Sequence, residues 1–415
     1  MKIGVIGLGY VGLPLAVGFA KEGHSVVGID TDPRKIDAIA EQRSYVGDVP
    51  DEDLREIGDL LRATSRYADL ASCDTVVIAV PTPLTRNREP DLGHLVASGT
   101  ELARVLQQGQ LVILESTTYP GTTRERLVPL LEESGLAAGR DFNVAFSPER
   151  IDPGRTDFTL RNTPKVVGGL TDACLERAVA LYEEVCDEVV AVTTPEVAEL
   201  SKLLENIFRS VNIALVNELA MLCDRMGIDI WEVVEAAATK PYGFMSFRPG
   251  PGMGGHCLPV DPFYLAWKAR EYDRQTEFIE LAGEVNQAMP HYCAGKIARA
   301  LNEHEKSVRG SRVVIVGVSY KAGVGDLRES PALKMMRILS AQGADLRYHD
   351  EFVPELPDFG LRHESLDAAI ERADVVAIVT AHPGLDVERL VRETSLLVDF
   401  RGVTRGIEAP NLVRL

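Results

Sequence analysis

The sequence predicts an α/β protein with two Rossmann-like, doubly wound domains joined by a central helical domain that contains a long helix. Three observations support this fold class. Short apolar runs alternate with amphipathic stretches toward both ends of the chain, a glycine-rich turn follows the first apolar run, and residues 197–226 contain neither Gly nor Pro. Alternation of strands and helices at this spacing is typical of a parallel sheet covered on both faces.

The expected elements follow from the periodicity of the apolar residues. Buried strands are expected at Lys2–Ile6, Ser25–Ile29, Thr75–Val80, Leu111–Leu114 and Asn143–Phe146, and a helix at Val11–Glu22. Further helices are expected at Val197–Met226, at Asp229–Ala238 and from Phe263 to about Asn302, with irregular structure over residues 239–262.

After residue 310 the strand–helix pattern starts again. Arg312–Val316 resembles the first strand, and Leu346–His349 ends in Asp350 much as the second strand ends in Asp30. Either a duplicated nucleotide-binding fold or the common composition of buried strands explains the likeness. We expect a first Rossmann-like domain over residues 1–195, a helical domain over 196–302 and a second Rossmann-like domain over 303–415.

The bulk composition excludes several classes of protein. The 415 residues carry a formal net charge of −18, which argues against wrapping of nucleic acid. Six cysteines lie at 73, 174, 186, 223, 257 and 293 without a C-x-x-C pair or a zinc-like spacing, so we expect no metal and a reducing compartment. No apolar run approaches the roughly 18 residues of a membrane span. We therefore expect a cytoplasmic protein.

The turn Gly7-Leu-Gly9-Tyr10-Val11-Gly12 follows a strand and opens a helix. Its glycines allow a tight turn and a close approach to a pyrophosphate, which the helix N-terminus attracts. Asp30 ends the next strand, where a carboxylate accepts from ribose hydroxyls and repels a 2′-phosphate, so NAD is favoured over NADP. Lys35 lies either near the adenosine or at the surface.

Polar segments follow three of the expected strands, at the sheet edge where open parallel sheets bind ligands. Pro81-Thr82 and Ser116-Thr117 are expected to line the cofactor cleft, although ordinary turn residues are the alternative. Glu149-Arg150 follows the strand ending at Phe146. A carboxylate there handles protons or positions a water, unless it is simply solvated.

Lys202 and Asn206 are four residues apart on the long helix and so share one face. A lysine beside an apolar stripe often extends its ammonium to water. The alternative is a partly desolvated ammonium that stabilises an alkoxide or oxyanion, with the Asn206 amide as a second donor. Both interpretations remain open from the sequence.

A single cysteine, Cys257, lies in a loop rich in glycine, and Gly254 is among the glycines that precede it. Glycines let backbone amides crowd an oxyanion or a phosphate. A loop of this composition makes a poor apolar core, so a nucleophilic thiol is favoured over a structural one. Asp261 is a candidate base, and His256 is either a base or a pocket wall. A thiol beside a dinucleotide fold suggests a four-electron oxidation through a covalent intermediate.

The second Rossmann-like region lacks the three-glycine fingerprint, so we expect it to bind a mononucleotide. Lys321 follows its first strand, and Arg328 and Arg401 add guanidinium groups suited to a pyrophosphate. Phosphate-bearing ligands at both ends and a thiol between them predict NAD together with a nucleotide-linked substrate.

With these motifs in this order, the whole chain resembles the UDP-glucose/GDP-mannose (nucleotide-sugar 6-) dehydrogenase family. The resemblance rests on Gly7-x-Gly9-x-x-Gly12, Pro81-Thr-Pro, Ser116-Thr117, Pro148-Glu149, Lys202-x-x-x-Asn206, Gly254-Gly-x-Cys257-x-x-x-Asp261 and Lys321 with Asp326-x-Arg328-x-Ser330. It implies an NAD-binding first domain, a central domain for dimerisation and catalysis, and a UDP-sugar-binding last domain.

The resemblance also implies roles for individual residues. Cys257 would carry a thiohemiacetal and then a thioester. The implied catalytic residues are Cys257, Lys202, Asn206, Asp261, Glu149 and Thr117. The implied cofactor contacts come from Gly7, Gly9, Tyr10, Val11, Gly12, Asp30, Lys35, Pro81, Thr82, Thr117 and Arg328. The implied substrate contacts come from Glu149, Arg150, Lys202, Asn206, Arg248, Gly254, Lys321 and Arg401, with Arg248 reaching its ligand across a dimer.

The run from Pro249 to Tyr264 is similar to the branch of the family that acts on UDP-N-acetylhexosamines. It favours UDP-N-acetylglucosamine over UDP-N-acetylmannosamine or UDP-glucose, and a uronic acid product for surface polysaccharide. A two-electron hydroxyacid dehydrogenase would leave Cys257 idle, as would an epimerase acting at C2. A nucleotide-sugar sensor without activity would not need Cys257, Lys202 and Asp261 together.

Overall fold

The computed structural model of the chain describes residues 1–85, 87–151, 157–255 and 258–415. These residues form two compact units. Unit 1 comprises Met1–Glu205 and Phe263–Arg274, and unit 2 comprises Asn206–Pro262 and Gln275–Leu415. The helical middle of the chain is thus divided between the two units, and the three-domain division expected from the sequence stays a prediction.

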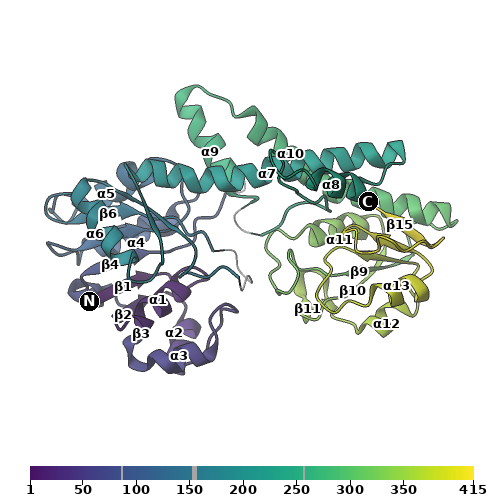
Figure 1. Cartoon of the computed structure of the whole chain (residues 1–415). Helices are drawn as coiled ribbons and strands as arrows, with labels where there is room; N and C mark the ends of the chain where they lie inside the picture. Colours follow the sequence, from purple (N-terminus) through teal and green to yellow (C-terminus); the bar gives the residue numbers. More distant parts are fainter. Residues whose placement is uncertain (86, 152–156, 256–257) are drawn as a thin grey trace. The chain divides into compact units, whose positions relative to one another are not determined.

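An eight-stranded sheet forms the centre of unit 1 (Figure 1). Its strands are β1 (Lys2–Ile6), β2 (Ser25–Ile29), β3 (Leu61–Thr64), β4 (Thr75–Ile78), β5 (Leu111–Leu114), β6 (Asn143–Phe146), β7 (Lys165–Gly169) and β8 (Val189–Val192), in the order β3-β2-β1-β4-β5-β6-β7-β8. Neighbouring strands are parallel except that β7 runs antiparallel to β6. This reversal was not expected, because a short apolar strand does not encode its direction.

Helices cover both faces of this sheet, because alternate residues of each strand point to opposite sides. They are α1 (Gly12–Lys21), α2 (Pro33–Ala40), α3 (Asp51–Ile57), α4 (Gly93–Ala103), α5 (Val128–Glu132) and α6 (Asp172–Tyr182). In β4, Val77 packs in the cluster with α1, α3 and α6, whereas Val76 and Ile78 pack in the cluster with α4 and α5. All four residues of β4 are buried, as expected for a central parallel strand.

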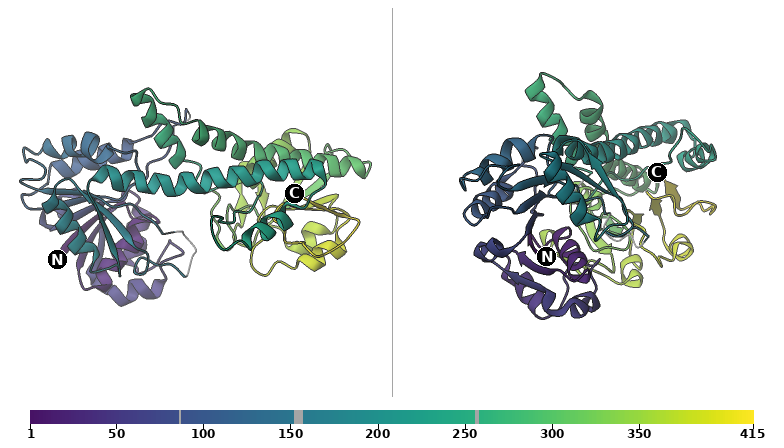
Figure 2. Two further views of the ribbon diagram at one scale, coloured as in Figure 1. Left: turned by 45° about the horizontal axis from the view of Figure 1, so that its top comes forward. Right: turned by 60° about the vertical axis from the view of Figure 1, so that its left-hand side comes forward.

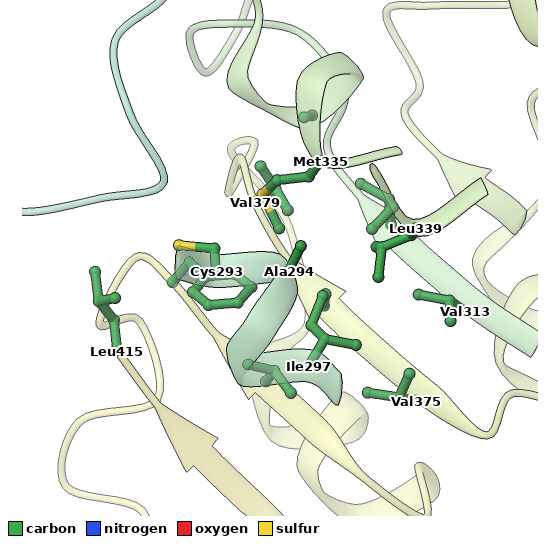
Figure 3. Packing of buried hydrophobic residues seen from close by; sticks show 14 of the residues in the cluster. Cys293, Ala294, Ile297, Val313, Met335, Leu339, Val375, Val379 and Leu415 are labelled. Atoms are coloured by element: carbon green, nitrogen blue, oxygen red, sulfur yellow. The ribbon is translucent and has the colours of Figure 1, made fainter. Parts of the chain in front are cut away.

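Unit 2 contains a second parallel sheet, with strand order β10-β9-β13-β14-β15. Its elements are α8 (Ile230–Ala238), α10 (Glu277–Glu303), β9 (Arg312–Val316), α11 (Pro331–Ala341), β10 (Asp345–His349), the hairpin β11 (Glu355–Leu356) and β12 (Leu361–Arg362), α12 (Leu366–Ile370), β13 (Val375–Ile378), α13 (Val387–Glu393), β14 (Leu397–Asp399) and β15 (Leu412–Arg414). In Figure 3, Ile297 of α10 lies with Val313 of β9 and Val375 of β13 in the buried core.

The two sheets confirm the predicted α/β fold class. The order β2-β1-β4-β5 of the first sheet recurs as β10-β9-β13-β14 in the second. Helix α7 (Pro195–Met226) confirms the expected long helix, and its second half runs beside α10 in unit 2 (Figure 2), where Asn217 and Asn286 are hydrogen-bonded.

The helical stretch expected from Phe263 to about Asn302 is instead two helices. Helix α9 (Asp261–Ala269) ends near Asp273, whose φ of 55° is left-handed, and α10 begins at Glu277. A left-handed residue cannot continue an α-helix, so the chain turns there. Across the described residues, we find no helix with both the length and the apolar character that a membrane crossing requires.

Helix α7 is anchored in unit 1 by a buried carboxylate. Glu199 accepts hydrogen bonds from the N–H of Gly121 (2.5 Å), the N–H of Thr123 (2.8 Å) and the hydroxyl of Thr123 (2.7 Å). Burial raises the pKa of Glu199 to about 7. The segment that follows β5 is thereby tied to the first turns of α7.

This anchor predicts a pH dependence of stability. Between the ordinary value of 4.5 and the folded value near 7, folded Glu199 binds more protons than unfolded Glu199. Raising the pH through that window therefore lowers the free energy of unfolding, by about 3 kcal/mol at most. We expect the Tm of the wild type, measured by calorimetry, to fall relative to that of Glu199→Gln between about pH 5 and about pH 8.

Glu196→Gln is the matched control on the same helix. Burial of Glu196 is outweighed by its hydrogen bond with Arg124, so its pKa is lowered and it stays charged throughout this window. That variant should shift the Tm by a similar amount at each pH. Parallel Tm profiles for the wild type and Glu199→Gln would contradict the assignment.

Candidate active site

The glycine turn after β1 has the geometry of a dinucleotide site. Gly7 has a φ of 92°, which favours glycine, and a Cβ on Gly12 would lie 1.8 Å from the carbonyl oxygen of Gly7. The protein's own backbone therefore requires glycine at both positions. A Cβ on Gly9 would meet no protein atom within 4 Å. The space beside Gly9 therefore fits a pyrophosphate at the N-terminus of α1, and these residues fit NAD.

Asp30 directly follows β2. Its carboxylate accepts a hydrogen bond from the N–H of Leu8 (3.0 Å) and forms an ion pair with Lys35 (2.8 Å). Burial would raise the pKa of Asp30, but Lys35 and the N–H groups of Asp32 and Leu8 outweigh it, and on balance the pKa is lowered. Asp30 is thus a charged carboxylate beside the turn. Tyr10 is exposed and Val11 is half-buried.

The ends of β4 and β5 are joined by side chains that fix the backbone. The Thr82 hydroxyl donates to the carbonyl of Thr117 (2.6 Å), and the Ser116 hydroxyl donates to that of Val80 (2.7 Å). Tyr264 of α9 donates to the carbonyl of Thr82 (2.7 Å). These bonds leave the side chain of Thr117 half-buried at the sheet edge, while Pro81 is exposed.

Glu149 follows β6 and is held from two sides. Its Oε1 accepts the N–H groups of Arg150 (2.7 Å) and Ile151 (2.5 Å), and its Oε2 lies 3.7 Å from Nζ of Lys165. Arg150 makes an ion pair with Glu205 of α7 (2.8 Å). Unit 1 thereby brings the Glu149 loop to the turn of α7 that follows Lys202.

Lys202 lies one turn after Glu199 on α7 and is 8% exposed. This burial does not fit an ammonium that extends into bulk water. It supports the alternative expected from the sequence, a partly desolvated cation that stabilises negative charge on a ligand.

Asn206 and Asp261 are brought together in unit 2, although 55 residues separate them. Nδ2 of Asn206 donates to Oδ2 of Asp261 at 2.5 Å, and both residues are buried. Asp261 is the first residue of α9 and lies four positions after Cys257. The pair therefore joins an amide of α7 to the carboxylate at the first residue of α9.

The glycine-rich loop packs tightly in unit 2. A Cβ on Gly254 would lie 2.5 Å from Cβ of Tyr320, and the N–H of Gly255 donates to the carbonyl of Arg328 (2.9 Å). The N–H of Gly250 donates to Asn217 of α7 (2.9 Å). The loop thus lies against the turn that carries Lys321. His256 and Cys257 lie outside the described residues.

The arginines of unit 2 that are candidates for ligand binding differ in burial and in their partners. Nε of Arg401 donates to the carbonyl of Val379 (2.5 Å), and a Cβ on Gly250 would lie 2.9 Å from its Nη1. Burial lowers the pKa of Arg401, partly offset by Asp399. Arg328 makes a bidentate ion pair with Asp326, and Arg248 is exposed.

The described cysteines, at 73, 174, 186, 223 and 293, are all buried. Burial raises the pKa of Cys73 and of Cys186 to about 11 each and raises that of Cys293 further. The thiols of Cys73, Cys186 and Cys293 therefore stay protonated at neutral pH and are poor nucleophiles. Because all five described cysteines are buried, Cys257 remains the candidate nucleophile.

Several residues that shape the site were not predicted from the sequence: Lys165, Tyr264, Asn217, Glu199 and Tyr320. Most of them lie in segments whose sequence is typical of ordinary strands or helices. The one available signal was Lys165, a lysine at the start of the apolar run Lys165–Gly169. A buried charge in a strand needs a partner, and no local pattern identifies that partner.

A dinucleotide turn, a second nucleotide-type sheet and a buried amide–carboxylate pair are the features expected of an NAD-dependent dehydrogenase of nucleotide sugars. The chain belongs to the UDP-glucose/GDP-mannose dehydrogenase family. Residues 1–186 match its NAD binding domain, residues 196–288 its central domain and residues 314–406 its UDP binding domain. The expected family, cofactor and class of substrate are confirmed.

Individual relatives extend over most of the chain. A UDP-N-acetyl-D-mannosamine dehydrogenase of Pyrococcus horikoshii is 36% identical over 98% of this chain and 100% of its own. A UDP-N-acetyl-D-glucosamine 6-dehydrogenase of Pseudomonas aeruginosa is 38% identical over 85% of this chain and 83% of its own. The solved structure of the UDP-D-ManNAc dehydrogenase of Pyrococcus horikoshii has a TM-score of 0.92 at 34% identity, covering 100% of this chain and 99% of that one.

The open space at Gly9 predicts a variant with a selective defect. Gly9→Ala adds a methyl group that meets no protein atom but enters the expected path of the pyrophosphate. We expect its Kd for NAD, measured by calorimetric titration, to rise at least about tenfold, or ~1.4 kcal/mol, while its Tm stays within about 2 °C of the wild type.

Gly12→Ala is the contrasting variant, because its methyl group would collide with the carbonyl of Gly7. It should lower the Tm as well as the affinity. Wild-type affinity for NAD in Gly9→Ala would show that the cofactor does not approach this turn.

Proposed function

We propose that the chain oxidises C6 of UDP-N-acetylglucosamine to the uronic acid in two NAD-dependent steps, through a thioester on Cys257. The observation that carries the proposal is the buried hydrogen bond between Asn206 and Asp261. Asp261, the carboxylate of this pair, lies four residues after Cys257 in the sequence, and a carboxylate near a nucleophilic thiol has a use in covalent chemistry. A two-electron dehydrogenase would use Lys202 and Asn206 but would leave Cys257 without a role.

When bound at the Gly7–Gly12 turn, NAD supplies the hydride acceptor for each oxidation. The chain's own residues handle the remaining chemistry. The Cys257 sulfur adds to the aldehyde carbon, and the resulting oxyanion needs donors, which Lys202 and Asn206 provide. In the last step a water attacks the thioester, a C–O bond forms, the C–S bond breaks and the thiolate leaves.

Proton transfer falls to the carboxylates. Glu149, with both oxygens held, is suited to accept a proton from the attacking water, and Thr117 to hold that water. Asp261, bonded to Asn206, keeps the amide oriented and serves the protons of the thiol. The carboxylates of Glu149 and Asp261 are held by hydrogen bonds before substrate binds.

The nucleotide end of the substrate is assigned to unit 2. The family's UDP binding domain covers residues 314–406, which include Lys321 and Arg401. Two of the relatives act by name on UDP-N-acetylmannosamine and UDP-N-acetylglucosamine, and this supports an N-acetylhexosamine. The choice of the glucosamine sugar rests on the run from Pro249 to Tyr264.

The stoichiometry of NADH tests the reaction. We expect two NADH for each UDP-N-acetylglucosamine consumed, with a carboxylate product identified by mass spectrometry, and little turnover of UDP-N-acetylmannosamine or UDP-glucose. Cys257→Ser should lose at least about 10³-fold in kcat for free acid, because an oxygen ester is a poorer intermediate than a thioester.

Each other outcome is informative. One NADH per sugar would support a two-electron dehydrogenase and contradict the thioester. Two NADH with another UDP-sugar would overturn the choice of sugar and keep the mechanism. Binding without any turnover would support a sensor.

We further propose that a second copy of the chain covers an apolar stripe on α7. In unit 2 this stripe consists of Phe208, Leu215, Leu219, Leu222 and Met226, which are between 39% and 60% exposed. Their spacing of seven, four, three and four residues places them on one face of the helix. Such a continuous apolar surface is typical of an interface.

The stripe adjoins a candidate substrate residue. Phe247 packs edge-on against Phe208 at 5.7 Å between ring centroids, and exposed Arg248 follows it. A partner at this face would therefore meet the segment that carries Arg248.

Light scattering after size-exclusion chromatography tests the dimer. We expect the wild type to have twice the chain mass or a multiple of it, and Leu219→Glu to be monomeric, since a buried charge at an interface costs several kcal/mol. Val96→Glu, which replaces an exposed apolar residue of α4, is the matched control and should keep the wild-type mass. A monomeric wild type would refute this assembly.

A further inference from the structure

A buried lysine in unit 1 has no role in the reaction as described so far. Lys165 is the first residue of β7, the strand that runs antiparallel to β6, and its side chain is 4% exposed. Its Nζ lies 3.0 Å from Oε1 of Glu115 and 3.7 Å from Oε2 of Glu149. One ammonium thus faces carboxylates from the ends of two neighbouring strands, β5 and β6.

The surroundings of Lys165 keep it charged. The charged and titratable groups around it are Glu115, Glu149, Tyr182 and Cys186. Burial alone would lower the pKa of Lys165, but Glu115 and Glu149 raise it on balance. The ring of Tyr182 lies 5.1 Å from Nζ and adds a cation–π contact.

Glu115 completes the cluster and has no solvent contact of its own. The Tyr182 hydroxyl donates to the same oxygen, Oε1, that faces Lys165. Burial raises the pKa of Glu115, opposed chiefly by Lys165. Glu115 also precedes Ser116-Thr117, so the cluster reaches both the Thr117 segment and the Glu149 loop.

The geometry at Glu149 shows what Lys165 contributes there. Backbone N–H groups hold Oε1, and among the described residues Lys165 is a charged group that faces Oε2. Without the ammonium, only the two N–H bonds to Oε1 would orient the carboxylate, and Oε2 would no longer be held in one position.

We propose that Lys165 is a positioning residue for hydrolysis, holding the Glu149 carboxylate oriented toward the attacking water without itself contacting substrate. The inference rests on the proposed function, because it takes Glu149 as the group that receives the water proton. In that step the water oxygen bonds to the thioester carbon, its proton moves to Glu149, and the C–S electron pair leaves with the sulfur of Cys257. No electron acceptor is needed.

A double-mutant cycle on the full-length enzyme tests the inference. We expect Lys165→Met to lower steady-state kcat by roughly 10²-fold, in the range of a lost general base. Single-turnover release of two NADH should change less than about threefold, since the hydride steps precede hydrolysis. The thioester should then accumulate on Cys257 and be detected by mass spectrometry after acid quench.

The decisive comparison is made in the Glu149→Gln background. If Lys165 acts through Glu149, adding Lys165→Met there should lower kcat by less than about threefold. Lys165→Arg should recover most of the activity, because it keeps a cation in place to face Oε2 of Glu149. An equal loss in both backgrounds would overturn the proposal and leave a merely structural role.

Lys268 offers the matched control. It is another buried lysine of unit 1, with two glutamate partners, Glu125 and Glu271, each at 2.7 Å. Lys268→Met should have the same effect on kcat in the wild-type and Glu149→Gln backgrounds. A cycle in which Lys268 also depends on Glu149 would overturn the specific link between Lys165 and Glu149.

A second variant and the wild-type stoichiometry cover the cases in which Lys165→Met does not fold or the proposed function fails. If Lys165→Met does not fold, Lys165→Met/Glu115→Gln removes one charge of each sign and is compared with Glu115→Gln alone, in both Glu149 backgrounds. Failure of the proposed function is recognised separately, because the wild type would then not release two NADH per sugar. A wild type that does so, with hydrolysis unaffected in every Lys165 variant, contradicts only the present inference.

Discussion

Both compact units are anchored to helix α7 by hydrogen bonds from its buried polar side chains. Buried residues on separate turns of α7 form hydrogen bonds with different segments of the chain. Glu199 accepts three hydrogen bonds from the segment after β5 in unit 1, and in unit 2 Asn206 holds Asp261 while Asn217 holds the start of the glycine-rich loop. Because a helix fixes the rise and rotation between residues, the positions of these groups along α7 are set by their spacing in the sequence.

Buried polar groups perform most of this anchoring. Glu115, Lys165 and Glu199 are charged or titratable groups with little or no exposure, and each has several partners in the protein. A buried ion pair adds little to stability, because desolvation opposes the attraction, but removing one member leaves the other unpaired. Such groups therefore specify one arrangement of loops, which a reaction with several proton transfers requires.

The glycines near the candidate site differ in whether a side chain there would collide with the protein. Gly12 and Gly254 lie where a methyl group would collide with the protein, at Gly7 and Tyr320, so their absence of a side chain serves the fold. A Cβ on Gly9 would meet only open space, so the structure itself does not require glycine there. The glycines of one sequence motif therefore have different physical reasons, which the motif alone does not distinguish.

The sequence by itself determined the two sheets, the long helix, the dinucleotide turn and the placement of Lys202 and Asn206 on one face of that helix. These features depend on local periodicity and short spacing. Only the tertiary structure decided the reversal of β7, the break before α10, and the contacts Asn206–Asp261 and Glu115–Lys165–Glu149. Those contacts join residues that are far apart in the chain. Their energies come from burial and charge pairing, which arise only when the strands and helices have packed.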